Sequence, residues 1–196
     1  VVADYQIKLH VFRRDGDPAK ALRRLVVAER LLWGATLVYF NSTHSAGDFC
    51  EALLLDGVQA VTVTAATSID ERMRIASQLD AGTLEVVCLC GCWNESFDLA
   101  CIAAVVFAEP RGSPINKCQV ARRGSRPHPA KAFYRVILWT TAANGDGHSP
   151  GAEDQLLRCF FDDDESLRDC VRHRGGGECP LRLRLVLDPE LEVDEE

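Results

Sequence analysis

The sequence has no long hydrophobic run and no secretory signal. No apolar segment reaches about 18 residues, so we expect no span across a membrane. The start of the chain, Val1-Val2-Ala3-Asp4, lacks the basic region and apolar stretch of a signal peptide. It also lacks an initiator methionine, and we expect the chain to be part of something longer. We expect an intracellular location, cytoplasmic or nuclear.

The sequence also lacks a phosphate-binding loop. No G-x-x-x-x-G-K-[ST] pattern occurs, and no Asp-Glu-x-His/Asp motif follows a buried strand early in the chain. Asp162-Asp-Asp-Glu165 imitates such an acidic motif, but it lies late in the chain and in a helical pattern. We interpret it as a solvated turn. We therefore do not expect this chain by itself to bind a magnesium–nucleoside triphosphate productively.

The nine cysteines do not form a recognisable framework. Their odd number argues against a closed set of disulfides, and a reducing compartment fits better. Cys88, Cys90 and Cys92 alternate within an apolar segment, as small hydrophobic residues on a buried strand do. A metal cluster of these residues with Cys101 is the alternative, but structural zinc sites use wider spacings. We expect no metal.

A basic segment stands out in an otherwise acidic protein. The 196 residues carry a net charge of −7, yet residues 111–135 contain seven lysines and arginines and no acidic residue. Arg123 and Arg126 are three residues apart, which places both guanidinium groups on one side of a helical turn. Paired guanidinium groups suit a polyanion such as a triphosphate or a nucleic-acid backbone. The alternative is a solvated basic loop.

Strand and helix patterns alternate along the chain. Apolar–polar alternation or continuous apolar runs predict strands at 5–12, 35–40, 58–63, 84–89, 102–107 and 133–139. Capping residues predict helices from Asp17-Pro18 to Gly34, from a cap at Thr43 or Ser45 to Leu55, from Ser68 to Gly82, and from about Pro114 to Arg122. Successive strand–helix units predict an α/β fold with a parallel sheet covered by helices on both faces.

The remaining third of the chain reads differently. The pattern of residues 141–187 predicts an appendage with a helix over 152–174 and an edge strand over 181–187. In the edge strand, leucine and arginine alternate. Residues 188–196 form a strongly acidic tail that we expect to be disordered. We therefore divide the chain into a first domain at 1–140, the appendage and the tail.

Five short segments follow the predicted strands in a distinctive order. They are Leu37-Val-Tyr-Phe-Asn-Ser42, Thr64-Ala-Ala-Thr67 with Arg72, Asn94-Glu-Ser-Phe-Asp-Leu-Ala100, Glu109-Pro-Arg-Gly-Ser-Pro114, and Gln119-Val-Ala-Arg-Arg-Gly-Ser-Arg126-Pro. With them, the stretch from about Tyr5 to Trp139 resembles the second RecA-like motor domain of superfamily 2 nucleic-acid helicases. The segments match that family's motif IV, its T-G-x-T…R segment, motif V, a connector and motif VI. The chain departs from the family pattern by having Ala65, Ser96 and Arg122 at glycine positions and Ala100 at a proline position.

The resemblance implies roles for particular residues. Asn41, Ser42, Thr64, Thr67 and Asn94 would contact the nucleic-acid backbone. Asp98, with Glu95, would lie near the bound nucleotide. Gln119, Arg123 and Arg126 would face the triphosphate, where the arginines would stabilise charge in the transition state. Most of these residues follow predicted strands, and ligands of open parallel sheets sit beyond the carboxyl ends of the strands.

The first interpretation is therefore the second motor domain of an ATP-dependent helicase or translocase that acts on DNA or RNA. Its Mg-ATP would be held mainly by a first RecA-like motor domain, in the same longer chain or in a separate one. The alternative is a catalytically inactive RecA-like module that binds nucleic acid or protein. A different nucleotide-binding α/β enzyme is a third interpretation.

Overall fold

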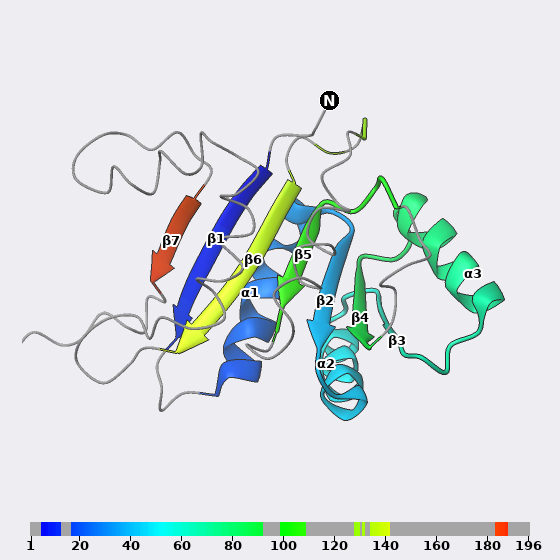
Figure 1. The fold of residues 1–196 in the computed structure, drawn as a ribbon, viewed down its shortest axis with the longest axis horizontal. Helices are drawn as coiled ribbons and strands as arrows, with labels where there is room; N and C mark the ends of the chain where they lie inside the picture. The colour runs from blue at the N-terminus through cyan, green and yellow to red at the C-terminus, as the bar shows by residue number, and fades with distance from the viewer. Residues whose placement is uncertain are drawn as a thin grey trace, which may run out of the picture.

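In the part of the chain that the structure describes, the sheet has seven strands, and every hydrogen-bonded pair of strands is parallel. The computed structural model describes residues 5–12, 17–91, 99–108, 128–129, 131, 134–141 and 183–187. Across the sheet the strand order is β3-β4-β2-β5-β6-β1-β7 (Figure 1). The strands are β1 Tyr5–Phe12, β2 Thr36–Phe40, β3 Ala60–Val63, β4 Val86–Cys90, β5 Ala104–Phe107, β6 Tyr134–Thr141 and β7 Leu183–Leu187. The predicted parallel α/β architecture is confirmed.

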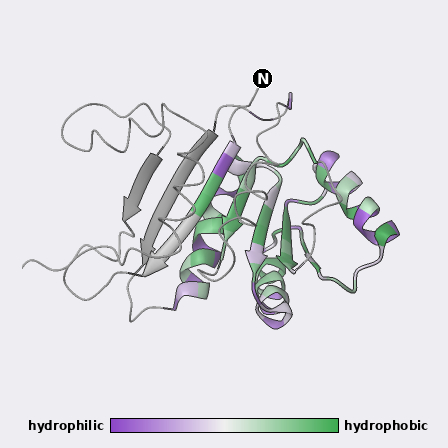
Figure 2. Cartoon of the chain, in the orientation of Figure 1, coloured by the Kyte–Doolittle hydropathy of each residue, from purple (hydrophilic) through white to green (hydrophobic). Residues whose placement is uncertain are grey.

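Strands β4 and β5 lie inside the sheet and are hydrophobic. Every residue of β4 and β5 is buried, and both strands are coloured as hydrophobic along most of their length (Figure 2). Strands buried on both faces need continuous apolar runs, and this is how the sequences VVCLC and AVVF read. Cys88 and Cys90 are among these buried residues, as their alternation predicts.

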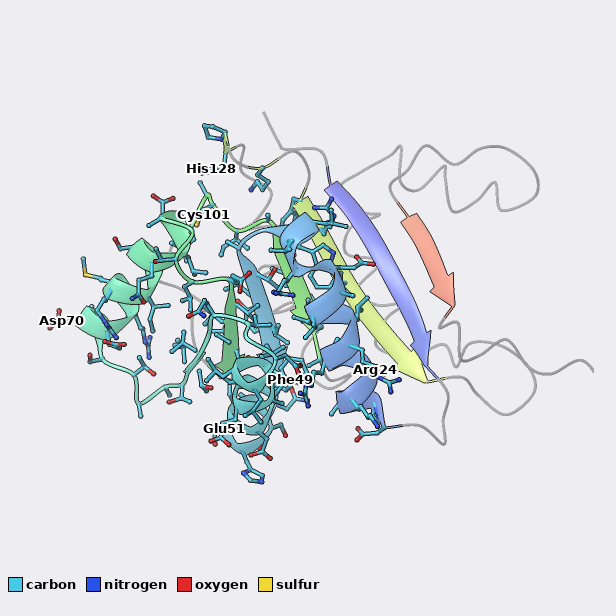
Figure 3. The ribbon with its side chains drawn as sticks, turned by 180° about the vertical axis from the view of Figure 1, so that it is seen from behind. Arg24, Phe49, Glu51, Asp70, Cys101 and His128 are labelled. Atoms are coloured by element: carbon cyan, nitrogen blue, oxygen red, sulfur yellow. The ribbon has the colours of Figure 1, made fainter. Side chains whose placement is uncertain are left out.

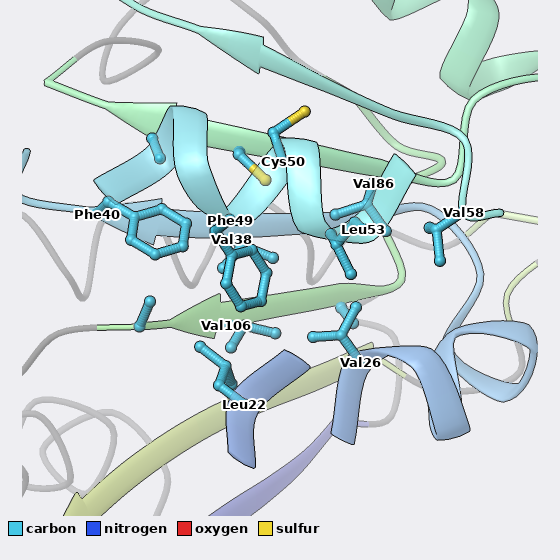
Figure 4. Packing of buried hydrophobic residues seen from close by; sticks show 14 of the residues in the cluster. Leu22, Val26, Val38, Phe40, Phe49, Cys50, Leu53, Val58, Val86 and Val106 are labelled. Atoms are coloured by element: carbon cyan, nitrogen blue, oxygen red, sulfur yellow. The ribbon is translucent and has the colours of Figure 1, made fainter. Parts of the chain in front are cut away.

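Three helices in the described part cover the two faces of the sheet. Helices α1 (Pro18–Trp33) and α2 (Thr43–Leu55) pack on one face, and α3 (Ile69–Asp80) packs on the other. Leu22 and Val26 of α1 meet Phe49 and Leu53 of α2 over the inward side chains of the strands (Figure 4). Neighbouring residues of one strand serve opposite faces, so that Leu37 belongs to the α3 side and Val38 to the α1–α2 side.

The ends of α1 follow the sequence signals. The Asp17 carboxylate accepts hydrogen bonds from the backbone N–H groups of Ala19 at 3.0 Å and Lys20 at 3.1 Å, and Pro18 occupies the first helical position. Gly34 ends the helix with a φ of 76°, a left-handed conformation that favours glycine. Both predicted ends of this helix are therefore confirmed.

The prediction for the N-cap of α2 is wrong, by one residue for Thr43 and by three for Ser45. Neither Thr43 nor Ser45 caps this helix; its N-cap is Ser42, which has extended backbone angles. Three hydroxyl residues lie close together here, and all of them are competent caps. The position of the cap depends on where the preceding strand ends. Because β2 ends at Phe40, the backbone changes from extended to helical at Ser42.

Of the two hydrogen bonds expected of the capping box at α3, the one accepted by the Ser68 side chain is confirmed. The Ser68 hydroxyl accepts a hydrogen bond from the backbone N–H of Glu71 at 3.2 Å. The Glu71 carboxylate pairs with Arg74, at 2.6 and 3.0 Å. The helix ends at Asp80, slightly before the expected Gly82.

The last strand returns to the first. β7 lies at the edge of the main sheet and pairs in parallel with β1, with Ile7 opposite Leu183 and Val11 opposite Leu187. The edge strand predicted near 181–187 is thus part of the same sheet as residues 5–141. The helices expected at 114–122 and 152–174 and the acidic tail lie outside the described residues.

Candidate nucleic-acid interface

Polar residues gather where β2 and β3 end. Asn41 and Ser42 follow β2, and Thr64 to Thr67 follow β3. Both strands pair in parallel with β4, and the pairs Phe40–Cys90 and Val63–Leu89 place their ends almost level. Because neighbouring strands are about 4.8 Å apart, the two groups start about 10 Å from each other. The carboxyl edge thus carries both groups expected to contact nucleic acid.

Ser42 has two possible tasks at this edge. Its hydroxyl oxygen accepts hydrogen bonds from the backbone N–H groups of His44 at 3.2 Å and Ser45 at 3.4 Å. A hydroxyl that accepts in this way still has its own hydrogen to donate. The cap therefore fixes the oxygen in place and leaves a donor for a ligand oxygen.

The residues after β3 form a closed turn. The backbone N–H of Thr64 donates to the Thr67 hydroxyl at 3.0 Å, and the backbone N–H of Thr67 donates to the Thr64 carbonyl at 3.1 Å. The Thr64 hydroxyl accepts from the backbone N–H of Ala66 at 3.2 Å. Both threonine oxygens are thus held by the backbone, and the hydroxyl hydrogens remain to be donated.

A residue from the following helix braces this turn. The Nη2 atom of Arg72 donates to the carbonyls of Thr64 at 3.1 Å and Ala65 at 3.2 Å. Charged donors form the stronger class of hydrogen bonds. In the sequence, Arg72 belongs to the segment that resembles T-G-x-T…R, and no individual role was predicted for it. Its position four residues after the Ser68 cap, one helical turn from the start of α3, is the signal that points back to the turn.

A pocket of about 520 Å³ opens beside this edge, between the first halves of α1 and α2. Leu22, Phe40, Phe49, Ala52 and Ala108 supply apolar lining, and Asp17, Lys20, Arg23, Ser45 and Asp48 supply polar lining, with Arg23 paired to Asp56. Residues of the first turn of each helix line this pocket, and Asp17 and Ser42 accept hydrogen bonds from the backbone N–H groups of these turns. The pocket therefore suits an apolar group better than a phosphate.

Two buried thiols form a pair under α2. A hydrogen bond from the Cys88 thiol lowers the pKa of Cys50 to about 7, against the opposing effect of burial. The same contact and burial raise the pKa of Cys88 well above its usual value. Cys50 is 5% exposed and lies against the central strands (Figure 4). The pair therefore belongs to the core, set back from the carboxyl edge.

The opposite, amino edge of the sheet holds a second group of polar residues. Lys131 is 8% exposed and donates from Nζ to the carbonyls of Ala100 at 3.0 Å and Ile102 at 3.1 Å. His128 lies 3.7 Å from the Asp80 carboxylate at the end of α3, where Cys101 also lies (Figure 3). Sequence reasoning did not single out Lys131, because a lone lysine in a loop carries no signal of burial.

The other predicted site residues lie outside the described residues. They are Asn94, Glu95, Asp98, Gln119, Arg123 and Arg126, and their roles stay predictions. Within the described residues there is no group of three or more His, Cys, Asp or Glu side chains that could hold a metal ion. None of the helices in the same part of the chain is long and apolar enough to cross a membrane.

Comparison with known proteins identifies the fold. No family model and no curated protein matches the sequence. The structure is similar to the C-terminal domain of the DEAD-box protein Dbp5, with a TM-score of 0.64 and 13% identity over 94% of this chain and 91% of that one. It is also similar to the ATP-dependent Type ISP restriction-modification enzyme LlaBIII bound to DNA, with a TM-score of 0.70 and 13% identity over 96% of this chain.

A third similar structure is S. cerevisiae Dbp5 bound to RNA and ADP BeF3, with a TM-score of 0.62 and 14% identity over 95% of this chain. The matched regions cover 16% of the LlaBIII chain and 42% of that Dbp5 chain, so this chain corresponds to one part of each larger protein. Identities this low establish architecture and leave activity open. The protein has the fold of the C-terminal domain of the DEAD-box protein Dbp5.

Proposed function

We propose that this chain is the second motor domain of an ATP-dependent helicase or translocase, and that its carboxyl edge binds the nucleic-acid backbone. One observation carries the proposal. The Thr64–Thr67 turn is braced by Arg72 and stands level with Asn41 and Ser42, on the edge of a RecA-like sheet. The similar structures of LlaBIII bound to DNA and Dbp5 bound to RNA and ADP BeF3 support a nucleic-acid ligand and the use of a nucleotide.

The chemistry of the edge fits phosphate oxygens. Ser42, Thr64 and Thr67 each have a hydroxyl oxygen occupied as an acceptor and a hydrogen left to donate. Two groups about 10 Å apart can contact different phosphates of the same strand. Contacts of this kind fix the register of a strand and carry no sequence information. We therefore expect binding with little preference for base sequence.

Other residues would contact the bound nucleotide. Gln119, Arg123 and Arg126 would face the triphosphate, with Asp98 and Glu95 near the nucleotide, as the family resemblance implies. Among the described residues the helix N-termini are capped by Asp17, Ser42 and Ser68, and no cradle for a triphosphate is formed. The phosphate loop and the Mg²⁺ ligands would come from a first motor domain. This chain would then contribute arginines and orient the nucleic acid.

The carboxyl edge can be tested by oligonucleotide binding. Fluorescence anisotropy with labelled single-stranded DNA and RNA would compare the native chain with Thr64→Val and Thr67→Val, which keep the shape and remove the hydroxyl. We expect each variant to bind at least about fivefold more weakly, the equivalent of about 1 kcal/mol for the lost hydrogen bond to the ligand, because each also loses an acceptor that holds the turn. Thr67→Ser keeps the hydroxyl and should bind nearly as the native chain does.

Thr83→Val is the matched control. Thr83 is exposed and lies before β4, at the opposite edge of the sheet, where its hydroxyl donates to the Gln78 carbonyl. It should lower stability slightly and leave oligonucleotide binding unchanged. Equal binding by the native chain, Thr64→Val and Thr67→Val would show that this edge is not the interface.

The alternative function is an inactive RecA-like module that binds nucleic acid or protein. It is favoured by Ala65, Ser96 and Arg122, which replace glycines of the family pattern, and by the apolar pocket between α1 and α2. Hydrolysis of ATP by the full-length protein, stimulated by the oligonucleotide and lost in Arg123→Ala, would exclude the inactive module. Oligonucleotide binding without any hydrolysis would establish it.

A further inference from the structure

The pocket between α1 and α2 has the size and the walls of a site for a small ligand. Its volume of about 520 Å³ lies within the range of about 300–1,000 Å³ that such sites occupy. Phe40 and Phe49 form an aromatic wall, with ring centres 5.2 Å apart and ring planes tilted by 52° (Figure 4). Both rings also belong to the core, so this wall is in place before a ligand arrives. A flat and largely apolar group therefore fits the pocket.

The charges around the pocket balance. Its lining contains two acidic residues, Asp17 and Asp48, and two basic residues, Lys20 and Arg23. Arg23 is paired with Asp56, and the Asp17 carboxylate accepts the hydrogen bonds that begin α1. A lining without net charge gives little attraction to a phosphate or another multiply charged ligand. It suits an uncharged group that forms hydrogen bonds.

Three polar side chains of the lining can serve the edge of such a group. The Ser45 hydroxyl can donate and accept, and the exposed Lys20 ammonium group can donate. The Asp48 carboxylate lies 3.3 Å from the exposed His44 ring, and its two oxygens have room for a further donor. A carboxylate in a protein accepts well from the amino group of cytosine. An aromatic wall with these groups beside it matches a nucleobase, which has an apolar face and a polar edge.

The pocket adjoins the residues that we expect to contact phosphates. Phe40 is the last residue of β2, two positions before Ser42. The Ser42 hydroxyl accepts a hydrogen bond from the backbone N–H of Ser45 at 3.4 Å, and Ser45 lines the pocket. Phosphate and base of one nucleotide are separated by a single sugar. A nucleotide whose phosphate contacts Ser42 can therefore direct its base toward the pocket.

We propose that the pocket between α1 and α2 binds a nucleobase that carries an amino group, from the strand whose backbone contacts the carboxyl edge. The link to the strand rests on the proposed function. The aromatic wall receives the face of the base, and Asp48 accepts from its amino group. Contacts with phosphates carry no sequence information, so the pocket adds a weak preference for particular bases.

NMR titration of the ¹⁵N-labelled chain with cytidine and with uridine tests the pocket directly. These nucleosides carry no phosphate, and cytidine has an amino group where uridine has a carbonyl oxygen. We expect saturable shifts of the amides of 19–23 and 45–52 at about millimolar concentrations, with Kd about threefold lower for cytidine. Asp48→Asn should remove this difference. Equal affinity of the native chain for both nucleosides, or shifts confined to other amides, would overturn the proposal.

Ala52→Leu blocks the pocket without removing a polar group, and leucine favours a helix. It should abolish the shifts at an unchanged Tm. Ala76→Leu is the matched control, because Ala76 is a partly buried alanine of α3, on the other face of the sheet. Native affinity of Ala52→Leu for cytidine would overturn the proposal. If Ala52→Leu does not fold, Ser45→Ala decides, since it leaves the pocket open and should weaken cytidine binding about threefold.

The same titration with N-acetyltryptophanamide examines a different occupant, the aromatic side chain of a partner protein. This compound has a flat apolar ring and lacks the exocyclic amino group of cytosine. We expect weaker binding than that of cytidine, and Asp48→Asn should not change it. Tighter binding of N-acetyltryptophanamide than of cytidine would overturn the nucleobase assignment and favour a docking site for protein.

Oligonucleotides test the link to the strand. Fluorescence anisotropy would compare labelled oligocytidylate and oligouridylate of equal length, for which we expect a threefold lower Kd, about the ratio for the nucleosides, with oligocytidylate. Ala52→Leu should bind both alike, whereas Thr64→Val should weaken both and keep the ratio. Equal Kd values for the native chain would overturn the link and leave the proposed function standing. If neither oligonucleotide binds, the proposed function fails, and the nucleoside titration still decides whether the pocket takes a base.

Discussion

Arg72 and Thr64 are joined by a hydrogen bond of 3.1 Å from the Arg72 Nη2 atom to the Thr64 carbonyl, which ties α3 to the end of β3. A second bond from the same nitrogen reaches the Ala65 carbonyl. The turn that carries Thr64 and Thr67 is therefore shaped before any ligand arrives. A site that is already ordered loses less conformational freedom when it binds.

Removal of this brace should affect binding and stability together. Arg72→Ala should lower the free energy of unfolding by about 1–2 kcal/mol, because two carbonyls lose a charged donor. It should also weaken oligonucleotide binding at least as much as Thr64→Val does, since the whole turn loosens. Chemical denaturation and fluorescence anisotropy would measure the two effects. Arg74→Ala is the control, because Arg74 is exposed and pairs with Glu71 of its own helix; it should change neither quantity appreciably.

Variants of Ser42 should separate its two tasks. Ser42→Ala removes an N-cap and should cost about 1 kcal/mol, which lowers Tm by about 2–4 °C in a protein of this size. Ser42→Asp keeps a good cap but adds a negative charge at the edge. It should unfold like the native protein and bind oligonucleotides much more weakly. Ser42→Asn is the control, because asparagine is also a good N-cap and differs from aspartate in having no charge. Equal affinities of the Asp and Asn variants would remove Ser42 from the interface.

The thiol pair should make stability depend on pH. The pKa of Cys50 is about 7 in the folded chain, below its ordinary value of 9.0, so its thiolate favours the folded state. This contribution is complete above pH 9 and is lost as the pH falls through 7. The free energy of unfolding of the native protein, relative to Cys50→Ala, should therefore rise between pH 7 and 9 under reducing conditions. Urea denaturation across this range would measure it.

Cys101 provides a comparison of opposite sign. Burial raises the pKa of the Cys101 thiol, with a further contribution from Asp80. Its protonated form is favoured by folding, so its contribution is complete below pH 9 and is lost at higher pH. The native protein relative to Cys101→Ala should show no rise between pH 7 and 9. A parallel rise for both variants would contradict the assignment to Cys50.

The arginines of the basic segment should act in the chemical step. In the full-length protein, Arg123→Ala should leave Tm nearly unchanged and reduce nucleic-acid-stimulated ATP hydrolysis by about 10³–10⁵. Lysine at this position should restore little activity, because an ammonium group cannot reproduce the planar fork of a guanidinium. Arg122→Ala is the neighbouring control and should cost much less. The reverse ranking of Arg122 and Arg123 would show that the alignment with motif VI is shifted.

The sequence alone predicts the elements of this fold well because its signals are local. Six strands have continuous or alternating apolar residues, and Asp17 and Ser68 stand at the helix starts that their chemistry favours. The predicted start of α2 is wrong because Ser42, Thr43 and Ser45 are chemically equivalent caps. The residue that caps the helix is set by where β2 ends.

Contacts between residues far apart in the chain cannot be predicted from such local signals. The order of the strands, the pairing of β7 with β1, and the contacts of Lys131 with Ala100 and Ile102 depend on residues far apart in the chain. The same limit applies to the site. Asn41, Ser42, Thr64 and Thr67 are found at one edge, as strand ends predict, whereas the brace from Arg72 needs the geometry of α3 and the turn together.

The partners of β1 have a consequence for synthesis on the ribosome. Tyr5–Phe12 pairs with Tyr134–Thr141 on one side and with Leu183–Leu187 on the other. More than a hundred residues must therefore be translated after β1 before either neighbouring strand exists. Closing a loop of this length is slow, and an unpaired apolar strand is prone to join other chains. A nascent chain that stalls before residue 134 would need a chaperone to shield this strand.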